Sequence, residues 1–167
     1  MTMLATRSAR AVAVAAVSVA AVLSAAPSAS AVTKLTHSQA TAKLSAAGIT
    51  WSSSGNCSNR NVSTCTSFDQ INSTTIDGII TLKRSSGCAI NATGGTEVGH
   101  SSGTYSHWNG YKIDISLYSC VGSYITRTFP YAGTRGDGAP MYKSGAGNIY
   151  AKESNHWDIL YYNCGGC

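Results

Sequence analysis

The sequence predicts an α+β domain, with helices packed on one face of a small antiparallel sheet that disulfides stabilise. Apolar residues recur at helical spacing before Cys88 and at strand spacing after it. Six cysteines follow an apolar leader, which indicates an oxidising compartment and up to three disulfides. Because the helical segments come first and the strand segments later, helices and strands are expected to segregate in the fold.

Residues 1–31 have the pattern of a secretory signal peptide. Arg7 and Arg10 form a basic region, the apolar run 11–23 is short for a membrane span, and Ala29-Ser30-Ala31 is a small-residue cleavage site. We therefore expect a secreted, extracellular protein. The alternative is an uncleaved N-terminal anchor, which the cleavage signature disfavours.

The remaining 136 residues, 32–167, fit a single domain large enough to bury a core. This segment has ten Lys or Arg against seven Asp or Glu, a charge of +3 that is scattered rather than clustered. The distribution does not favour a nucleic-acid partner, but it suits loose attraction to anionic surfaces such as a Gram-positive wall. No second apolar run is long enough for a membrane helix, so we expect no membrane partner after signal cleavage, and a monomer.

Two helices are predicted in the first half of the mature segment. Residues 38–47 are rich in Ala, Gln, Lys and Leu, with Thr36 as a possible cap and Gly48 as a stop. Residues 75–84 carry isoleucines at helical spacing, with Gly87 just beyond the end. A glycine inside this second segment weakens its helix propensity.

Strand patterns dominate the second half. In 111–117 apolar and polar residues alternate, which is typical of a half-buried strand. The segment 118–128 is compatible with a helix or a loop, and 132–142 is predicted to be a Gly/Pro-rich loop. The predicted strands are 88–93, 111–117, 148–152 and 157–162.

The cysteines allow fifteen pairings, and the sequence does not choose among them. We favour Cys57–Cys65, because this pair would close a short polar loop. Cys164-Gly-Gly-Cys167 has the spacing of a metal-binding pair, but export favours a disulfide. The six are Cys57, Cys65, Cys88, Cys120, Cys164 and Cys167.

Two short segments carry the residues for metal chemistry. Residues 106–114 contain His107 and Asp114, and Gly110 allows the backbone to turn sharply between them. A turn followed by a strand can bring both side chains to one point. Residues 153–157 add one imidazole and one spare carboxylate. Two imidazoles, one carboxylate ligand and a nearby base are what an open catalytic zinc site requires.

The second segment supplies the third ligand and the base. His156 lies where a strand is predicted to begin, so it can approach the first two ligands from a neighbouring strand. Glu153 is close enough in sequence to lie beside the metal without binding it. One zinc ion held by two neutral imidazoles and a carboxylate stays net positive, which lowers the pKa of its water. Glu153 can then take the water's proton and deliver it to the leaving amine.

The order of these residues resembles the D-alanyl-D-alanine carboxypeptidase/dipeptidase family of zinc peptidases, which shares its fold with the hedgehog signalling domain and lysostaphin-type enzymes. The resemblance covers about Cys88 to Tyr162. It implies zinc ligands His107, Asp114 and His156, with Glu153 as general base. The positions that match the family's Ser-x-His-x-x-Gly-x-x-x-Asp and Glu-x-x-His motifs are Ser106, His107, Gly110, Asp114, Glu153 and His156.

The chain departs from the family where many members carry an arginine just before the first ligand. Here 93–100 contains no arginine. His100 can supply the electrophile instead, or Arg84 or Arg135 can approach from elsewhere. Recognition of a free terminal D-Ala carboxylate is therefore in doubt, and endopeptidase activity stays open.

The surroundings of the first motif supply candidate substrate contacts. Ser106, Tyr105 and Trp108 could line a groove and hold a peptide or sugar, although aromatic residues here are equally compatible with a core position.

The sequence thus predicts a secreted zinc metallopeptidase that hydrolyses peptide bonds of peptidoglycan stem peptides, as a carboxypeptidase or an endopeptidase. The alternative is a non-catalytic, zinc-containing binding or inhibitor module on the same fold. A third reading takes His107 and His156 as ordinary surface histidines.

Overall fold

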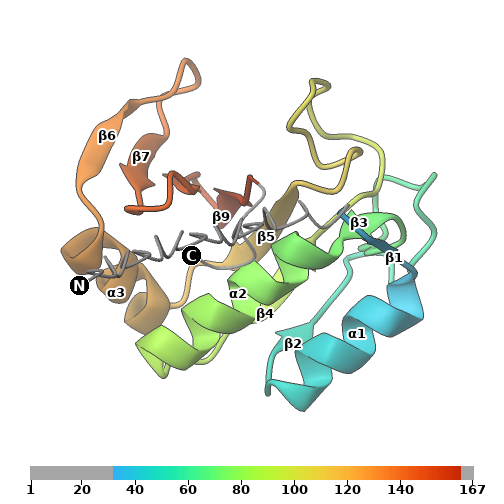
Figure 1. Ribbon diagram of the computed structural model, residues 1–167. Coiled ribbons are helices and arrows are strands. Elements are labelled where there is room, and N and C mark those ends of the chain that lie inside the picture. The colour runs from blue at the N-terminus through green and yellow to red at the C-terminus, as the bar shows by residue number, and fades with distance from the viewer. Residues whose placement is uncertain (1–31, 163–167) are drawn as a thin grey trace, which may run out of the picture. The chain divides into compact units, whose positions relative to one another are not determined.

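The computed structural model describes residues 32–162 (Figure 1). The predicted signal peptide, 1–31, and the last two cysteines, Cys164 and Cys167, lie outside the described residues. Within that range no helix is both long and apolar enough to cross a membrane. The described chain combines three helices with two sheets, which confirms the α+β class.

The first helix, α1 (His37–Ala46), begins at a capping box. The Thr36 hydroxyl accepts a hydrogen bond from the Gln39 backbone N–H, and the Gln39 side chain accepts one from the Thr36 N–H. Ala40 and Leu44, four residues apart, are buried on one face. The prediction of a helix over 38–47 that Thr36 caps is confirmed.

The second helix, α2 (Ser73–Ser86), ends at Gly87, which has the left-handed conformation that favours glycine. Gly78 has a packing role, because a Cβ at this position would lie 2.3 Å from the ring of buried Tyr161. The glycine that weakens the helix propensity is therefore the residue that lets the helix approach the sheet.

The segment 118–128, which the sequence leaves open as a helix or a loop, forms the third helix, α3 (Ser119–Thr128). Val121 and Ile125 are buried four residues apart, which is the spacing of one helical face. The disulfide Cys88–Cys120 ties its first turn to the segment before β4, and the predicted disulfide Cys57–Cys65 is also formed.

The larger sheet has seven strands in the order β2-β4-β5-β9-β8-β7-β6, and β1 pairs with β3 in a small separate sheet. It is mixed rather than purely antiparallel, because β2 runs parallel to β4. The strands are β1 (Lys34–Leu35), β2 (Thr50–Trp51), β3 (Ile71–Asn72), β4 (Asn91–Gly94), β5 (Lys112–Ser116), β6 (Tyr131–Thr134), β7 (Pro140–Lys143), β8 (Ile149–Lys152) and β9 (His156–Leu160).

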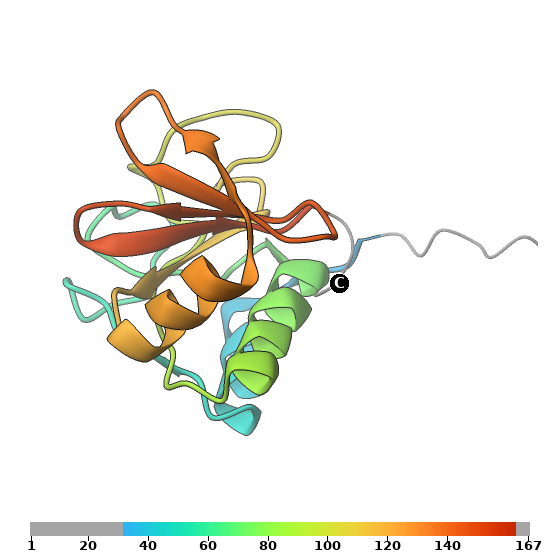
Figure 2. The ribbon, with the colours of Figure 1, turned by 90° about the vertical axis from the view of Figure 1, so that its left-hand side faces the viewer.

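The sequence predicts helices packed on one face of the sheet. In the structure the helices do not form one clear layer on a single face. Helix α1 packs against α2 and the short strands β1 and β2, whereas α2 contacts β5 and α3 (Figures 1 and 2).

The prediction of a loop over 132–142 is wrong. This segment contributes β6 and β7, which pair as an antiparallel hairpin with an irregular register. Pro140 is tolerated because it is the first residue of β7, where a missing N–H costs least. The turn of this hairpin carries Arg135 and Asp137, two residues that matter below.

The central strands β5 and β9 separate an apolar face from a polar one. Ile113 and Ile115 on β5 lie opposite Ile159 and Trp157 on β9, and all four belong to the buried core. The alternate positions project to the other face. There Asp114 lies opposite Asp158, and Ser116 lies opposite His156.

Candidate metal centre

The structure brings His107 and Asp114 together as the motif spacing predicts. A turn after His107 closes with a hydrogen bond from the Gly110 N–H to the His107 carbonyl, and Gly110 has a φ of 78°. The chain then enters β5, which carries Asp114. His107 Nε2 lies 3.3 Å from Asp114 Oδ1, and both side chains are buried.

His156 approaches from the neighbouring strand. It is the first residue of β9, and its Nε2 lies 3.6 Å from the same oxygen, Asp114 Oδ1. Glu153 precedes it in the tight turn after β8, where the Glu153 N–H donates to the His156 carbonyl. Glu153 Oε2 lies 3.5 Å from His156 Nε2.

His100 is the third imidazole at this point. Its ring stacks on that of His107 with centroids 3.8 Å apart, and its Nδ1 lies 3.9 Å from Asp114 Oδ2. The side chain is 26 % exposed. His100, His107 and Asp114 offer ligand atoms that all lie within 4.8 Å of one another, so this group could hold a metal ion.

The segment 93–100, which contains no arginine, orients these side chains. The Gly95 carbonyl accepts a hydrogen bond from His107 Nδ1 at 2.7 Å, which leaves Nε2 directed at Asp114. Buried Glu97 is within hydrogen-bonding distance of His100 Nε2, at 3.0 Å. Its carboxylate also accepts from the backbone N–H groups of Ser67 and Gly95.

Burial disfavours the charge on Glu97, but the bonds from His100 and from those backbone N–H groups hold the pKa of its carboxyl below the usual value. Sequence reasoning missed the roles of Gly95 and Glu97. Both residues lie in the Gly-Gly-Thr-Glu stretch of the sequence. Their roles become clear only when β4 is placed beside β5.

Asp158 is a third residue that sequence reasoning missed. It is buried, its Oδ1 lies 3.5 Å from His107 Nε2, and its Oδ2 contacts Lys112 at 2.6 Å and Arg135 at 2.7 Å. Although burial opposes ionisation, His107 and Lys112 hold the pKa of this carboxyl well below its usual range. The signal was the His156-x-Asp158 spacing, which puts both side chains on one face of a strand.

The centre is built to hold positive charge. Burial alone would lower the pKa of His107, yet Asp114 and Asp158 raise it to about 10. Asp114 Oδ1 and Asp158 Oδ1 are buried without a hydrogen-bond partner among the described residues. Buried carboxylate oxygens without such partners, next to imidazole nitrogens, are satisfied when a cation binds between them.

Arg135 enters from the turn of the β6–β7 hairpin. It forms ion pairs with Asp137, Glu153 Oε1 and Asp158, and the hydrogen bond to Asp137 raises the pKa of its guanidinium. The structure therefore brings Arg135 to the centre, while Arg84 remains in the last turn of α2. The hollow lined by His100, His107, His156, Glu153 and Arg135 has a volume of about 520 Å³.

Ser106, Trp108 and Tyr105, which are predicted to contact substrate, differ in their surroundings. Ser106 is buried and its hydroxyl accepts from the Asn109 N–H, so it stabilises the turn. Trp108 is 44 % exposed and lines an adjoining hollow, with the Arg60 guanidinium over its ring. Tyr105 packs edge-on against Tyr111, which is partly buried, and does not line the ligand hollow.

The arrangement thus groups two imidazoles, His100 and His107, with the Asp114 carboxylate. A third imidazole, His156, lies beside one Asp114 oxygen, and Glu153 beside it is held by Arg135. Such a set can bind one divalent cation and transfer a proton next to it. Comparison of the chain with family models, with curated proteins and with solved structures found no match.

Proposed function

We propose that this chain is a secreted zinc metallopeptidase that hydrolyses peptide bonds in peptidoglycan stem peptides. The observation that carries the proposal is that His107 and His156 both approach Asp114 Oδ1, with Glu153 beside His156. His107, His156 and Glu153 line one hollow. Secretion is supported by the signal-peptide pattern of 1–31 and by the two disulfides.

The spacing of the ligand atoms suits zinc. Tetrahedral zinc holds nitrogen and oxygen ligands at about 2.0–2.1 Å, which puts neighbouring ligand atoms about 3.3 Å apart. His107 Nε2 and His156 Nε2 lie 3.3 and 3.6 Å from Asp114 Oδ1. These three residues would hold the ion. When bound, zinc would polarise the scissile carbonyl and lower the pKa of a water molecule.

Glu153 would act as the general base. One of its oxygens, Oε1, contacts Arg135, and the other, Oε2, faces His156 Nε2. The arginine therefore orients the base through Oε1, and Oε2, which Arg135 does not contact, would accept the proton. Glu153 would take a proton from the attacking water as the C–O bond forms, and pass it to the amine nitrogen as the C–N bond breaks.

His100 would support the electrophilic side of the reaction. Its Nε2 is fixed at 3.0 Å from Glu97, and the side chain borders both the ligand hollow and the hollow beside Trp108. From that position it can stabilise charge that develops on the carbonyl oxygen.

The substrate class rests on the family resemblance and on charge. The mature chain carries +3, which suits an anionic cell wall. One Glu153 oxygen contacts Arg135 and the other faces His156, so the carboxylate is oriented as a base. This favours the peptidase over the non-catalytic module, because a binding module does not need an oriented base.

The test is mass spectrometry of muropeptides incubated with the mature protein, with and without a chelator, followed by zinc addition. We expect new products that the chelator abolishes and zinc restores. Zinc bound at one ion per chain without any hydrolysis would support the non-catalytic module instead.

A further inference from the structure

The candidate metal centre lies in the middle of three adjoining hollows. The central one, which contains His107 and His156, shares Asp137 and Glu153 with a second hollow of about 590 Å³. It shares the segment 99–101 with a third hollow of about 310 Å³. A substrate bound at the centre therefore has space on both sides.

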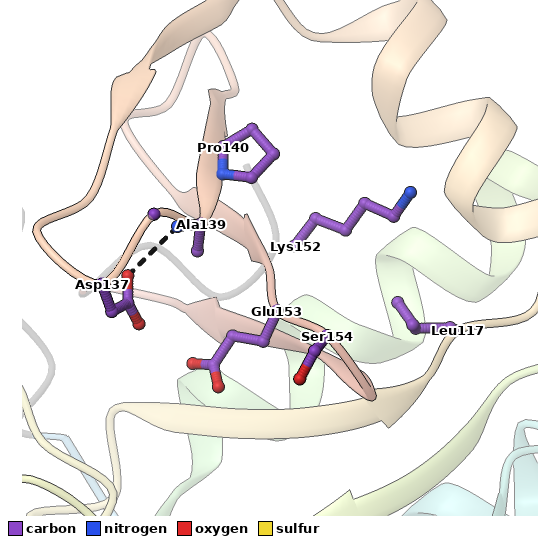
Figure 3. Close-up of a pocket in the computed structure, with 8 residues that line it drawn as sticks. Leu117, Asp137, Ala139, Pro140, Lys152, Glu153 and Ser154 are labelled. Atoms are coloured by element: carbon purple, nitrogen blue, oxygen red, sulfur yellow. Dashed lines mark hydrogen bonds between the residues drawn. The ribbon is translucent and has the colours of Figure 1, made fainter.

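The second hollow lies beyond Glu153 (Figure 3). Pro140, Leu117 and Ser154 border it, and the carboxylates of Glu153 and Asp137 mark its junction with the central hollow. The Lys152 side chain points away from Glu153 in this view. The volume of this hollow leaves room for substrate residues beyond the scissile bond, and its cation, Lys152, points away from Glu153.

The third hollow adjoins the central one at a different set of residues, which includes His100. Ser102, Trp108 and Asn109 line it with neutral side chains. The one carboxylate there, Glu97, is already bound to backbone N–H groups and His100. An uncharged stretch of peptide fits these walls, with the face of the exposed Trp108 ring that Arg60 does not cover as an apolar contact.

A carboxypeptidase needs a cation free to bind the terminal carboxylate one residue from the scissile bond. Apart from its imidazoles, the described lining of the central hollow has two cationic side chains, Lys112 and Arg135. Lys112 contacts Asp158, and Arg135 contacts Asp137, Glu153 and Asp158. Both charges are already neutralised by carboxylates of the chain itself.

We propose that the enzyme is an endopeptidase, which binds a peptide across all three hollows and cleaves an internal bond. This inference rests on the proposed zinc peptidase activity and specifies its substrate. The peptide extends past Glu153 on one side and past His100 on the other, with at least two residues on each side of the bond that is cleaved.

Two substrates test the inference against the carboxypeptidase alternative. The zinc-loaded protein is incubated with a purified pentapeptide muropeptide monomer and with a cross-linked dimer, and the products are identified by mass. Endopeptidase activity predicts a split stem or cross-link and no free terminal D-Ala. Release of terminal D-Ala alone would overturn this inference and leave the proposed function intact. No hydrolysis of either substrate by protein with one zinc per chain would overturn both.

Variants that fill one hollow at a time test the use of both sides. Ser102→Trp narrows the third hollow and Ser154→Trp narrows the second, and both serines are exposed. We expect each variant to keep one zinc per chain and to lose at least tenfold in kcat/KM for the cleaved substrate. Ser45→Trp, on the exposed side of α1, is the matched control. Loss in only one of the two variants would indicate a one-sided site and contradict the inference.

Discussion

Gly94 lies directly against the carboxylate of Asp114. The two residues are paired across β4 and β5, where the register shifts between Ala92 and Gly94. A Cβ built on Gly94 would lie 2.4 Å from Asp114 Oδ2. The absence of a side chain at this position is therefore what allows the Asp114 carboxylate to stay beside His107.

Gly94→Ala is expected to displace Asp114 and weaken zinc binding. Changes in the groups that support a metal ligand typically cost 10–100-fold in affinity, and we expect a loss of about that size. Competition against a chromophoric chelator measures it. Gly145→Ala is the matched control, because a Cβ there has no neighbour within 4 Å. Equal zinc affinity in the two variants would show that Gly94 does not position Asp114.

Glu97→Gln is expected to destabilise the fold at neutral pH by about 1–3 kcal/mol, because an amide cannot replace all the bonds that the buried carboxylate accepts. The folded-state pKa of Glu97 is lowered, so its contribution is present above the unfolded-state pKa, about 4.3, and is lost as pH falls through the folded-state value. Urea denaturation of both proteins at pH 7 and pH 3 measures this. A difference in the free energy of unfolding between the two proteins that is larger at pH 3 than at pH 7 would contradict the lowered pKa of Glu97.

Two imidazoles compete for the role of third ligand, and single substitutions separate them. We expect His156→Ala to lose more zinc affinity than His100→Ala, because His156 Nε2 lies 3.6 Å from Asp114 Oδ1, whereas His100 Nδ1 lies 3.9 Å from Oδ2. Isothermal titration with zinc measures both affinities. The reverse order would make His100, His107 and Asp114 the ligand set.

The two disulfides are expected to differ in their contribution to stability. Cys88–Cys120 spans 32 residues and Cys57–Cys65 spans 8. Loop-closure entropy gives about 4 and about 2.5 kcal/mol respectively. Replacing both cysteines of each pair by serine and measuring urea denaturation should show a loss larger by about 1 kcal/mol for the longer loop. A larger loss for the shorter loop would contradict the entropic account.

The sequence predicts best the helices and strands that are long enough to show a repeating pattern of apolar residues. Helices α1 and α2 and strand β5 carry repeated apolar positions, and these proved to be the buried faces. The two-residue strands β1, β2 and β3 are too short to show any period. The β6–β7 hairpin was predicted as a loop, because Gly133 and Pro140 hide its strand pattern.

The residues of the candidate site also fall into two groups, those that local motifs predict and those that depend on contacts between distant segments. Local motifs identified the side chains that surround the centre, since each motif lies within one turn or strand. The supporting groups depend on contacts between distant segments: Gly95 and Glu97 act through the approach of β4 to β5, and Asp158 through its pairing opposite Asp114. Such contacts cannot be read from spacing along one chain.

The central claim is that Glu153 is the base of a zinc peptidase, and Glu153→Gln tests it most directly. Zinc content and the rate of muropeptide hydrolysis are measured together for the wild-type protein, for this variant and for Asp77→Asn, which removes a carboxylate exposed on α2. General-base catalysis contributes about 10²–10⁴-fold. We predict that Glu153→Gln keeps one zinc per chain and loses at least about 100-fold in rate, while Asp77→Asn matches the wild type. A zinc-loaded Glu153→Gln protein with near-normal turnover would contradict the account.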